Sequence, residues 1–335
     1  MSNIEHTPLL HHGGRLRAAA ARYRIPLTDW LDLSTGINPR GWPVPTIPAE
    51  LWQRLPEDDD ALEESARAYY DCSDVLPTAG SQAALQLLPR LRAASRVGVL
   101  HPSYQEHAYA WRMAGHTVHE FTPDRLELAI PRLDVVILVN PNNPSGECFD
   151  RETLLAWHHA LALRGGWLII DEAFMDATPH LSMAPYCHAP GLIVLRSLGK
   201  FFGLAGARVG FVCAENNILD PLRVRLGPWP IASPARWIAI KALSDSPWQR
   251  AARDYLHTST WHLAQLLSDH AHAPHGGSAF FQWHCSDDAQ VLHERLAQQG
   301  ILTRFFDHPK SIRCGLPQDV SAWRRLTSAL KNAVQ

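Results

Sequence analysis

The chain has 335 residues, which is enough for about two domains of ordinary size. Apolar residues make up 46% and charged residues 19%, a balance typical of globular rather than disordered proteins. The formal charge of −2 leaves no overall basic surface for a nucleic acid, and no apolar run is long enough to span a membrane. Residues 1–17 also lack the apolar core of a signal peptide. We therefore expect a cytoplasmic protein that binds neither nucleic acid nor a membrane.

The predicted elements begin with a helix near residues 14–24, followed by an extended, proline-rich connection over residues 39–56. From about residue 75 to residue 213, short apolar segments alternate with longer amphipathic ones. Buried strands are predicted at residues 96–100, 117–121, 135–139, 168–170, 192–195 and 209–213, and helices at residues 82–92, 105–114 and 151–163. This alternation predicts an α/β domain with a mainly parallel central sheet.

After residue 234 the pattern changes to that of a smaller α+β domain. Helices are predicted at residues 236–243, 248–267, 289–299 and 320–333, and strands at residues 280–283 and 311–315. We therefore divide the chain into an N-terminal segment (1–40), a large domain (41–230) and a small C-terminal domain (231–335).

Lysine is scarce in this sequence. Only Lys200, Lys241, Lys310 and Lys331 occur among 31 basic residues, which a genome biased toward arginine codons would explain. Lysine can lose its proton and attack a carbonyl, whereas arginine cannot. Lys200 lies between Leu-Gly and Phe-Phe-Gly, a small and apolar setting, and is therefore the candidate nucleophile.

Four loops fall at the predicted carboxyl ends of strands, where ligands bind in α/β folds. Residues 78–82 (Thr-Ala-Gly-Ser-Gln) lead into a helix, whose free amides favour a phosphate, although many helices begin with Gly-Ser. Residues 140–146 (Asn-Pro-Asn-Asn-Pro-Ser-Gly) place side-chain amides in a turn, where they can donate to a ring oxygen. Residues 171–174 begin with an acid that needs a partner if it is buried. Residues 196–208 bring together a hydroxyl, an amine and a guanidinium group.

In their order and spacing, these loops resemble the aminotransferase-like family of fold-type I enzymes that use pyridoxal phosphate, over nearly the whole chain. The resemblance implies that Lys200 forms the Schiff-base link to the cofactor aldehyde and that Asp171 pairs with the pyridinium nitrogen. Residues 41–230 would then form the cofactor-binding domain. Taken one at a time, these side chains have structural explanations that are about equally good: a helix cap for Asp171, a core position for Tyr104, a surface ion pair for Arg208. The further cofactor contacts that the resemblance implies are Asn143 at the ring hydroxyl, Tyr104 stacked on the ring, Gly80, Ser81, Ser197 and Arg208 at the phosphate, and Gln82 beside them.

Residues 11–15 (His-His-Gly-Gly-Arg) and 31–39 (Leu-Asp-Leu-Ser-Thr-Gly-Ile-Asn-Pro) are similar to the opening of the threonine-phosphate decarboxylases of cobalamin biosynthesis. This likeness implies decarboxylation of L-threonine O-3-phosphate to (R)-1-aminopropan-2-yl phosphate. The N-terminal segment would then contribute to the substrate site. The substrate contacts that it implies are His12, Gly13, Asn38, Arg304 and Arg313.

Two other functions remain open at this stage. The first is transamination of a phosphorylated amino acid or amino alcohol such as histidinol phosphate, although residue 174 is Phe where those aminotransferases usually carry Tyr. The second is a non-catalytic regulatory module, which the intact lysine loop and the absence of a recognisable DNA-binding domain disfavour.

We expect a homodimer and no metal site. Related enzymes often use a Tyr to reach the cofactor phosphate across a dimer, but this position is Leu55, which has no hydroxyl and cannot make that contact. The six cysteines include no CxxC pair, which argues against a disulfide framework or a zinc ribbon. His270, His272 and His275 lie beside Pro and Gly and are expected to form a surface loop.

Overall fold

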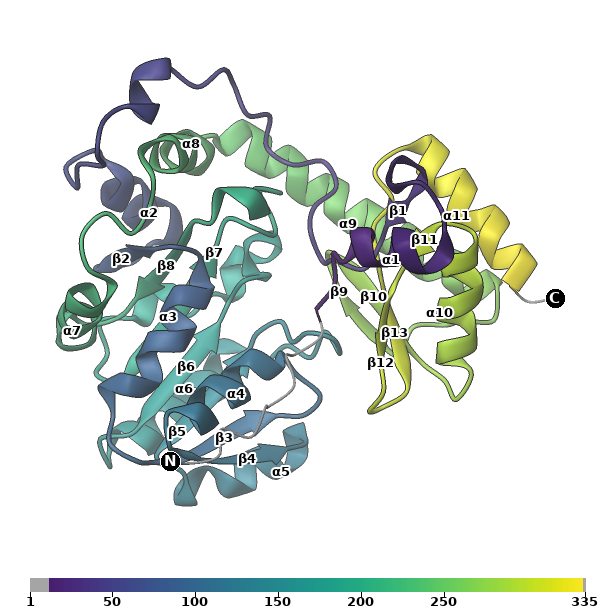
Figure 1. Ribbon diagram of the computed structural model, residues 1–335. Coiled ribbons are helices and arrows are strands. Elements are labelled where there is room, and N and C mark those ends of the chain that lie inside the picture. Colours follow the sequence, from purple (N-terminus) through teal and green to yellow (C-terminus); the bar gives the residue numbers. More distant parts are fainter. Residues whose placement is uncertain (1–11, 334–335) are drawn as a thin grey trace, which may run out of the picture.

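The structure, a computed structural model, describes residues 12–333, and its larger unit is built on a seven-stranded sheet (Figure 1). The strand order is β2-β8-β7-β6-β5-β3-β4, and all neighbours run parallel except β8, which is antiparallel to β2 and β7. The prediction of an α/β fold with a mainly parallel sheet is confirmed. The strands are β2 (Val75–Thr78), β3 (Arg96–Leu100), β4 (Thr117–Phe121), β5 (Val135–Val139), β6 (Trp167–Asp171), β7 (Leu192–Ser197) and β8 (Gly210–Cys213).

The central strands are apolar along most of their length because helices cover both faces of the sheet. All five residues of β5 are buried, and successive residues belong to different hydrophobic clusters. Val135 and Ile137 share a cluster with α3 (Ser81–Leu87), α4 (Gln105–Met113) and α7 (Asn216–Leu226). Val136 and Leu138 share the other cluster with α2 (Leu62–Tyr70), α5 (Pro123–Ala129) and α6 (Arg151–Ala162).

The smaller unit contains a four-stranded antiparallel sheet of order β12-β13-β10-β9. Its elements are β9 (Gly276–Ser278), β10 (Phe281–Cys285), α10 (Ala289–Gln298), β12 (Arg304–Phe306), β13 (Ser311–Gly315) and α11 (Val320–Ala333). The N-terminal part of the chain joins this unit: α1 (Leu16–Tyr23) contacts α10, and β1 (Leu31–Asp32) pairs in parallel with β11 (Ile301–Leu302) (Figure 1).

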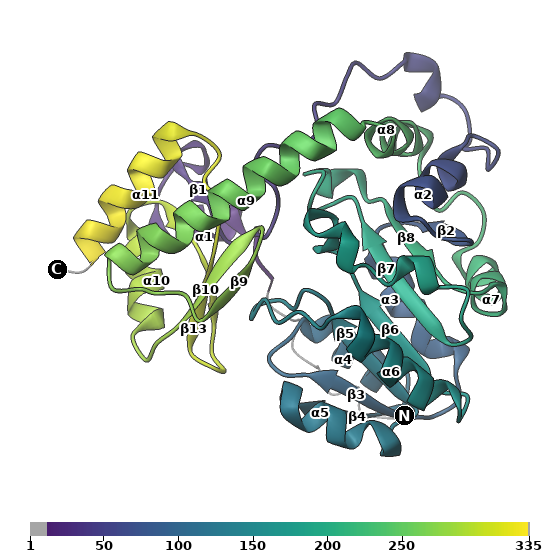
Figure 2. The same ribbon diagram turned by 180° about the vertical axis from the view of Figure 1, so that it is seen from behind.

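Two helices connect the units. Helix α8 (Ser233–Leu243) packs against α2 of the larger unit, and α9 (Ser246–Asp269) then runs 24 residues across to the smaller one (Figure 2). The side chain of Asp245 caps α9 by accepting from the Trp248 amide at 3.1 Å. Helix α9 thus spans from one unit to the other, and the predicted domain boundary at residue 231 stays a prediction.

The proline-rich connection is extended apart from one short 3-10 turn at Ala49–Trp52. None of the described helices is both long enough and apolar enough to cross a membrane.

Candidate active site

A cavity of about 960 Å³ is lined by residues of both units and of the N-terminal segment. It lies at the carboxyl ends of β3, β5, β6 and β7, where the sequence placed the four loops. The predicted site residues that line it are His12, Gly13, Ser81, Gln82, Tyr104, Asn143, Asp171, Ser197, Lys200, Arg208, Arg304 and Arg313. Of the other predicted site residues, Gly80 contacts Arg208, and Asn38 is not among the residues that line the cavity.

Lys200 follows β7, and its Nζ atom lies 5.7 Å from the centre of the Phe174 ring. Burial above all, and then the positive charge of Arg313, lower the pKa of Lys200 from 10.5 to about 8, against the opposing effect of Asp171. Arg208 adds a smaller effect in the same direction as burial. An appreciable fraction of the amine is therefore neutral, and so nucleophilic, near neutral pH.

Asp171 ends β6, and only 4% of the residue is exposed. Its Oδ2 atom lies 2.9 Å from Nε2 of His107, and its Oδ1 atom accepts from the Ala173 amide at 3.1 Å. Sequence reasoning missed His107, although its spacing from Tyr104 gave a signal, since residues three apart at a helix start share one face. The buried carboxylate therefore has the hydrogen-bonding partner that its burial requires.

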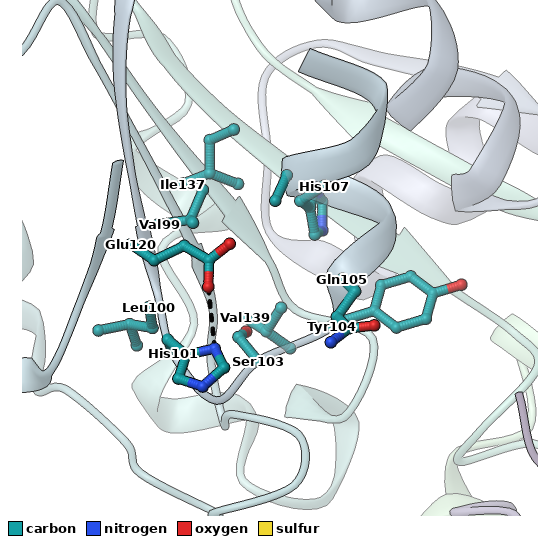
Figure 3. Close-up of a pocket in the computed structure, with 11 residues that line it drawn as sticks. Val99, Leu100, His101, Ser103, Tyr104, Gln105, His107, Glu120, Ile137 and Val139 are labelled. Carbon is teal, nitrogen blue, oxygen red and sulfur yellow. Dashed lines mark ion pairs between the residues drawn. The ribbon is translucent and has the colours of Figure 1, made fainter. Parts of the chain in front are cut away.

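Tyr104 directly precedes α4, and its hydroxyl donates to Oε1 of Gln82 at 3.2 Å. Burial raises the pKa of the Tyr104 hydroxyl above its ordinary value, so the ring stays neutral. A second cavity, of about 20 Å³, lies next to the 2.9 Å ion pair between His101 and Glu120. The Tyr104 ring points away from that ion pair (Figure 3). That space holds about one water molecule and is too small for a cofactor.

Gly80, Ser81, Ser197 and Arg208 form one corner of the site. A Cβ atom on Gly80 would lie 2.6 Å from Nη2 of Arg208, so glycine, at φ +72°, lets the guanidinium group reach the turn. The Ser197 hydroxyl accepts from the Gly199 amide at 3.1 Å. Two hydroxyls and a guanidinium group at one place suit a phosphate.

Arg313, on β13, is buried at the opposite side of the cavity. Its Nη1 atom donates to Oδ1 of Asn143 at 2.6 Å and its Nη2 atom to the carbonyl of Ser34 at 2.7 Å, while its buried Nε atom has no hydrogen-bond partner in the described part of the chain. Burial and the positive charge of Arg304 lower the pKa of Arg313 to about 10. An anion bound beside Arg313 would stabilise the charged guanidinium group and so offset both its burial and the repulsion from Arg304.

Arg304, on β12, lies directly opposite Arg313 in the sheet register. Burial lowers the pKa of Arg304, and the positive charge of Arg15 lowers it further. The sheet thus presents two adjacent guanidinium groups to a cavity that already has a separate phosphate-type corner.

The N-terminal residues reach the cavity from the smaller unit. Nε2 of His12 lies 2.7 Å from Oε1 of Glu106, a residue that sequence reasoning did not identify. Gly13 lies so close to the backbone of Ser34 that any side chain would clash. His11, part of the same motif, falls outside the described residues.

The structure does not bring Asn38 to the cavity as a substrate contact. Its Nδ2 atom donates to the carbonyl of Phe201 at 2.9 Å, and its backbone amide donates to the carbonyl of Lys200 at 3.0 Å. Asn38 therefore holds the lysine loop, and its predicted contact with the substrate stays a prediction.

The three predicted loop histidines lie between the end of α9 and the start of β9. The rings of His272 and His284 are 5.3 Å apart. Within residues 12–333, no group of three or more His, Cys, Asp or Glu side chains is arranged to hold a metal ion.

Comparison with known proteins identifies relatives over nearly the whole chain. Residues 53–333 match the aminotransferase class I and II family. A threonine-phosphate decarboxylase from Pseudomonas aeruginosa is 54% identical over 322 residues, which cover 96% of this chain and 97% of that protein. One from Sinorhizobium sp is 41% identical over 329 residues, covering 95% and 97%. The crystal structure of histidinol-phosphate aminotransferase from Sinorhizobium meliloti, in complex with pyridoxal-5'-phosphate, has a TM-score of 0.81 at 21% identity, covering 99% of this chain and 96% of that one.

Proposed function

The chain belongs to the aminotransferase class I and II family, and from that premise we propose that it is a pyridoxal-phosphate-dependent threonine-phosphate decarboxylase. It converts L-threonine O-3-phosphate to (R)-1-aminopropan-2-yl phosphate and carbon dioxide, a step that supplies cobalamin biosynthesis. The observation that supports this most is the pair Arg304 and Arg313 in the same cavity as Lys200, because a substrate with two anionic groups needs such a pair. The names of the relatives at 54% and 41% identity agree.

The residues present fit pyridoxal phosphate. Lys200 offers a partly neutral amine, Asp171 a buried carboxylate, and the corner of Gly80, Ser81, Ser197 and Arg208 a place for a phosphate. When bound, the cofactor supplies an aldehyde for the substrate amine and a protonated ring that withdraws electrons from the α-carbon.

Asp171 and Tyr104 act on the cofactor ring. Asp171, oriented by His107, holds a proton at the ring nitrogen, since an ionised carboxylate only accepts hydrogen bonds. From its place before α4, Tyr104 would pack against the ring, and Gln82 fixes the Tyr104 hydroxyl.

The choice between decarboxylation and transamination lies in how the substrate is oriented. Arg304, Arg313 and His12 would bind its two anionic groups, and this remote binding energy would fix the orientation in which the bond to the carboxylate, rather than the bond to the α-hydrogen, breaks. Asn143 orients Arg313 through its 2.6 Å hydrogen bond. Lys200 Nζ then provides the proton that takes the place of carbon dioxide on the α-carbon.

The assembly is proposed to be a homodimer. Trp52 and Leu55 on the proline-rich connection are 68% and 63% exposed, and Trp229 is 55% exposed. Arg54 lies near that last segment, since its carbonyl accepts from the Ser233 hydroxyl at 3.2 Å. Large apolar side chains gathered on a surface favour association. Sedimentation of the Trp52→Glu variant, compared with the unaltered protein, tests this; the cytoplasmic location stays a prediction.

Product analysis with threonine O-phosphate tests the function. We expect one carbon dioxide and one aminopropanol phosphate per substrate, with no keto-acid acceptor. Borohydride should fix the cofactor to the peptide that contains Lys200, and Lys200→Ala should abolish both this label and the reaction. Formation of glutamate from 2-oxoglutarate and histidinol phosphate would replace this function by the transaminase alternative.

A further inference from the structure

Glu106 lies in the first turn of α4 and contacts His12 and Gln82, which both line the cavity. Its side chain is only 14% exposed, and both of its oxygens are used. Oε1 lies 2.7 Å from Nε2 of His12, while Oε2 accepts from Nε2 of Gln82 at 3.0 Å and lies 3.5 Å from Nε2 of Gln86. The free amides of this helix start favour a negative charge at this position.

The contact with His12 joins the two units. Residues 12–15 are anchored to the smaller unit, because the Gly14 amide donates to the Ser34 hydroxyl at 2.7 Å and that hydroxyl donates to Asp32 at 2.6 Å. Glu106 belongs to α4 of the larger unit (Figure 1). The ion pair therefore connects two bodies whose surfaces both line the cavity.

The same contact sets the orientation of the His12 ring. The His12 and Tyr104 rings lie 5.9 Å apart, and both line the cavity. A carboxylate only accepts hydrogen bonds, so Nε2 of His12 carries a hydrogen and donates a hydrogen bond to Glu106. The His12 side chain is 45% exposed, and within the described residues Glu106 is its one polar partner. Without the carboxylate, that ring has little to keep it at the cavity.

We propose that Glu106 is a positioning residue for substrate binding: its carboxylate holds His12, and with it residues 12–15, at the cavity in the place where His12 meets the substrate phosphate. This proposal rests on the proposed function, since it concerns a phosphorylated substrate. The proton transfers at Lys200 lie outside this contact. Loss of Glu106 should therefore affect KM more than kcat.

A double-mutant cycle with His12 tests the proposal. The variants are Glu106→Ala, His12→Ala and the two combined, assayed for kcat and KM with threonine O-phosphate. We expect each single variant to raise KM about tenfold and to change kcat less than threefold, and the double variant to match His12→Ala within about twofold. Gln86→Ala removes the 3.5 Å contact with Glu106 and should leave both constants unchanged. Single effects that multiply in the double variant would overturn the proposal, because Glu106 would then act independently of His12.

Hydrogen exchange of the backbone amides of residues 13–16, measured without substrate, gives a second readout. It should rise in Glu106→Ala and His12→Ala but not in Gln82→Ala, which removes hydrogen bonds to Glu106 Oε2 and Tyr104 but keeps the contact between Glu106 and His12. If the unaltered protein decarboxylates threonine O-phosphate and exchange in Glu106→Ala is unchanged, the proposal is overturned. An unaltered protein that does not act on this substrate overturns the proposed function instead.

Discussion

Replacing Lys200 with Met should stabilise the cofactor-free protein at neutral pH. The pKa of Lys200 lies at about 8 in the folded chain against an ordinary 10.5, with burial as the main cause and Arg313 as the next. Each pH unit corresponds to 1.36 kcal/mol, so the charged lysine lowers the free energy of unfolding by about 3 kcal/mol at pH 7. Methionine has no charge to bury, so the Lys200→Met variant should regain most of this free energy of unfolding.

The sign of the pH dependence follows from the depressed pKa. Between pH 8 and 10.5 the unfolded chain binds the Lys200 proton and the folded chain does not, so stability gains as the pH rises through this range. The advantage of Lys200→Met should therefore be largest below pH 8 and fall to about 1.4 kcal/mol at pH 9.5.

Urea unfolding of the cofactor-free proteins at pH 7 and pH 9.5 measures this difference. Lys310→Met is the matched control, because Lys310 is exposed and no shift in stability is expected from its removal. A Lys200→Met variant no more stable than the unaltered chain at pH 7, or one equally stabilised at both pH values, would refute the reasoning.

Three further substitutions test other parts of the site. Asp171→Asn should still bind the cofactor, seen by absorbance, but lose several orders of magnitude in kcat, because an amide cannot hold the ring proton as a carboxylate does; near-normal turnover would make the acid merely structural. Arg304→Ala should lower the ratio of kcat/KM for threonine O-phosphate over threonine at least about tenfold, and an unchanged ratio would remove Arg304 from the substrate site. Arg196→Met leaves Glu172 and Asp176 buried without their shared cation and should lower the free energy of unfolding by about 3–5 kcal/mol in urea titrations; a loss below about 1 kcal/mol would contradict this.

Local pattern predicts the central strands well, because helices bury them on both faces. The strands at residues 96–100, 117–121, 135–139 and 311–315 were predicted with the bounds that the structure shows. The helix predicted over residues 82–92 ends at Leu87 and continues as a 3-10 turn, since Pro89 cannot donate to the helical ladder.

Elements that depend on distant partners could not be predicted in the same way. β1 and β11 have two residues each and exist because Leu31 pairs with Ile301, far along the chain. Helix α7 was missed because Pro221 lies inside it, and β2 because Pro77 interrupts a short apolar run.

The predicted site residues follow from motifs at strand ends, whereas their supporting partners do not. Glu106 has no motif of its own, and the spacing of His107 from Tyr104 is its one signal; only the fold brings these two side chains to His12 and Asp171. Arg313 lowers the pKa of Lys200 more than Arg208 does, and only tertiary packing brings β13, which carries Arg313, to the lysine loop.

The charges around Lys200 also link substrate binding to its protonation. The positive charge of Arg313 lowers the pKa of Lys200, and that of Arg304 in turn lowers the pKa of Arg313. A doubly anionic substrate bound to these guanidinium groups, as proposed above, would neutralise them and remove their repulsion of a proton on Nζ. Lys200 would then be most readily deprotonated, and most nucleophilic, before the substrate arrives. It would hold a proton more firmly once the substrate is bound, which is the state required of a group that must deliver a proton to the α-carbon.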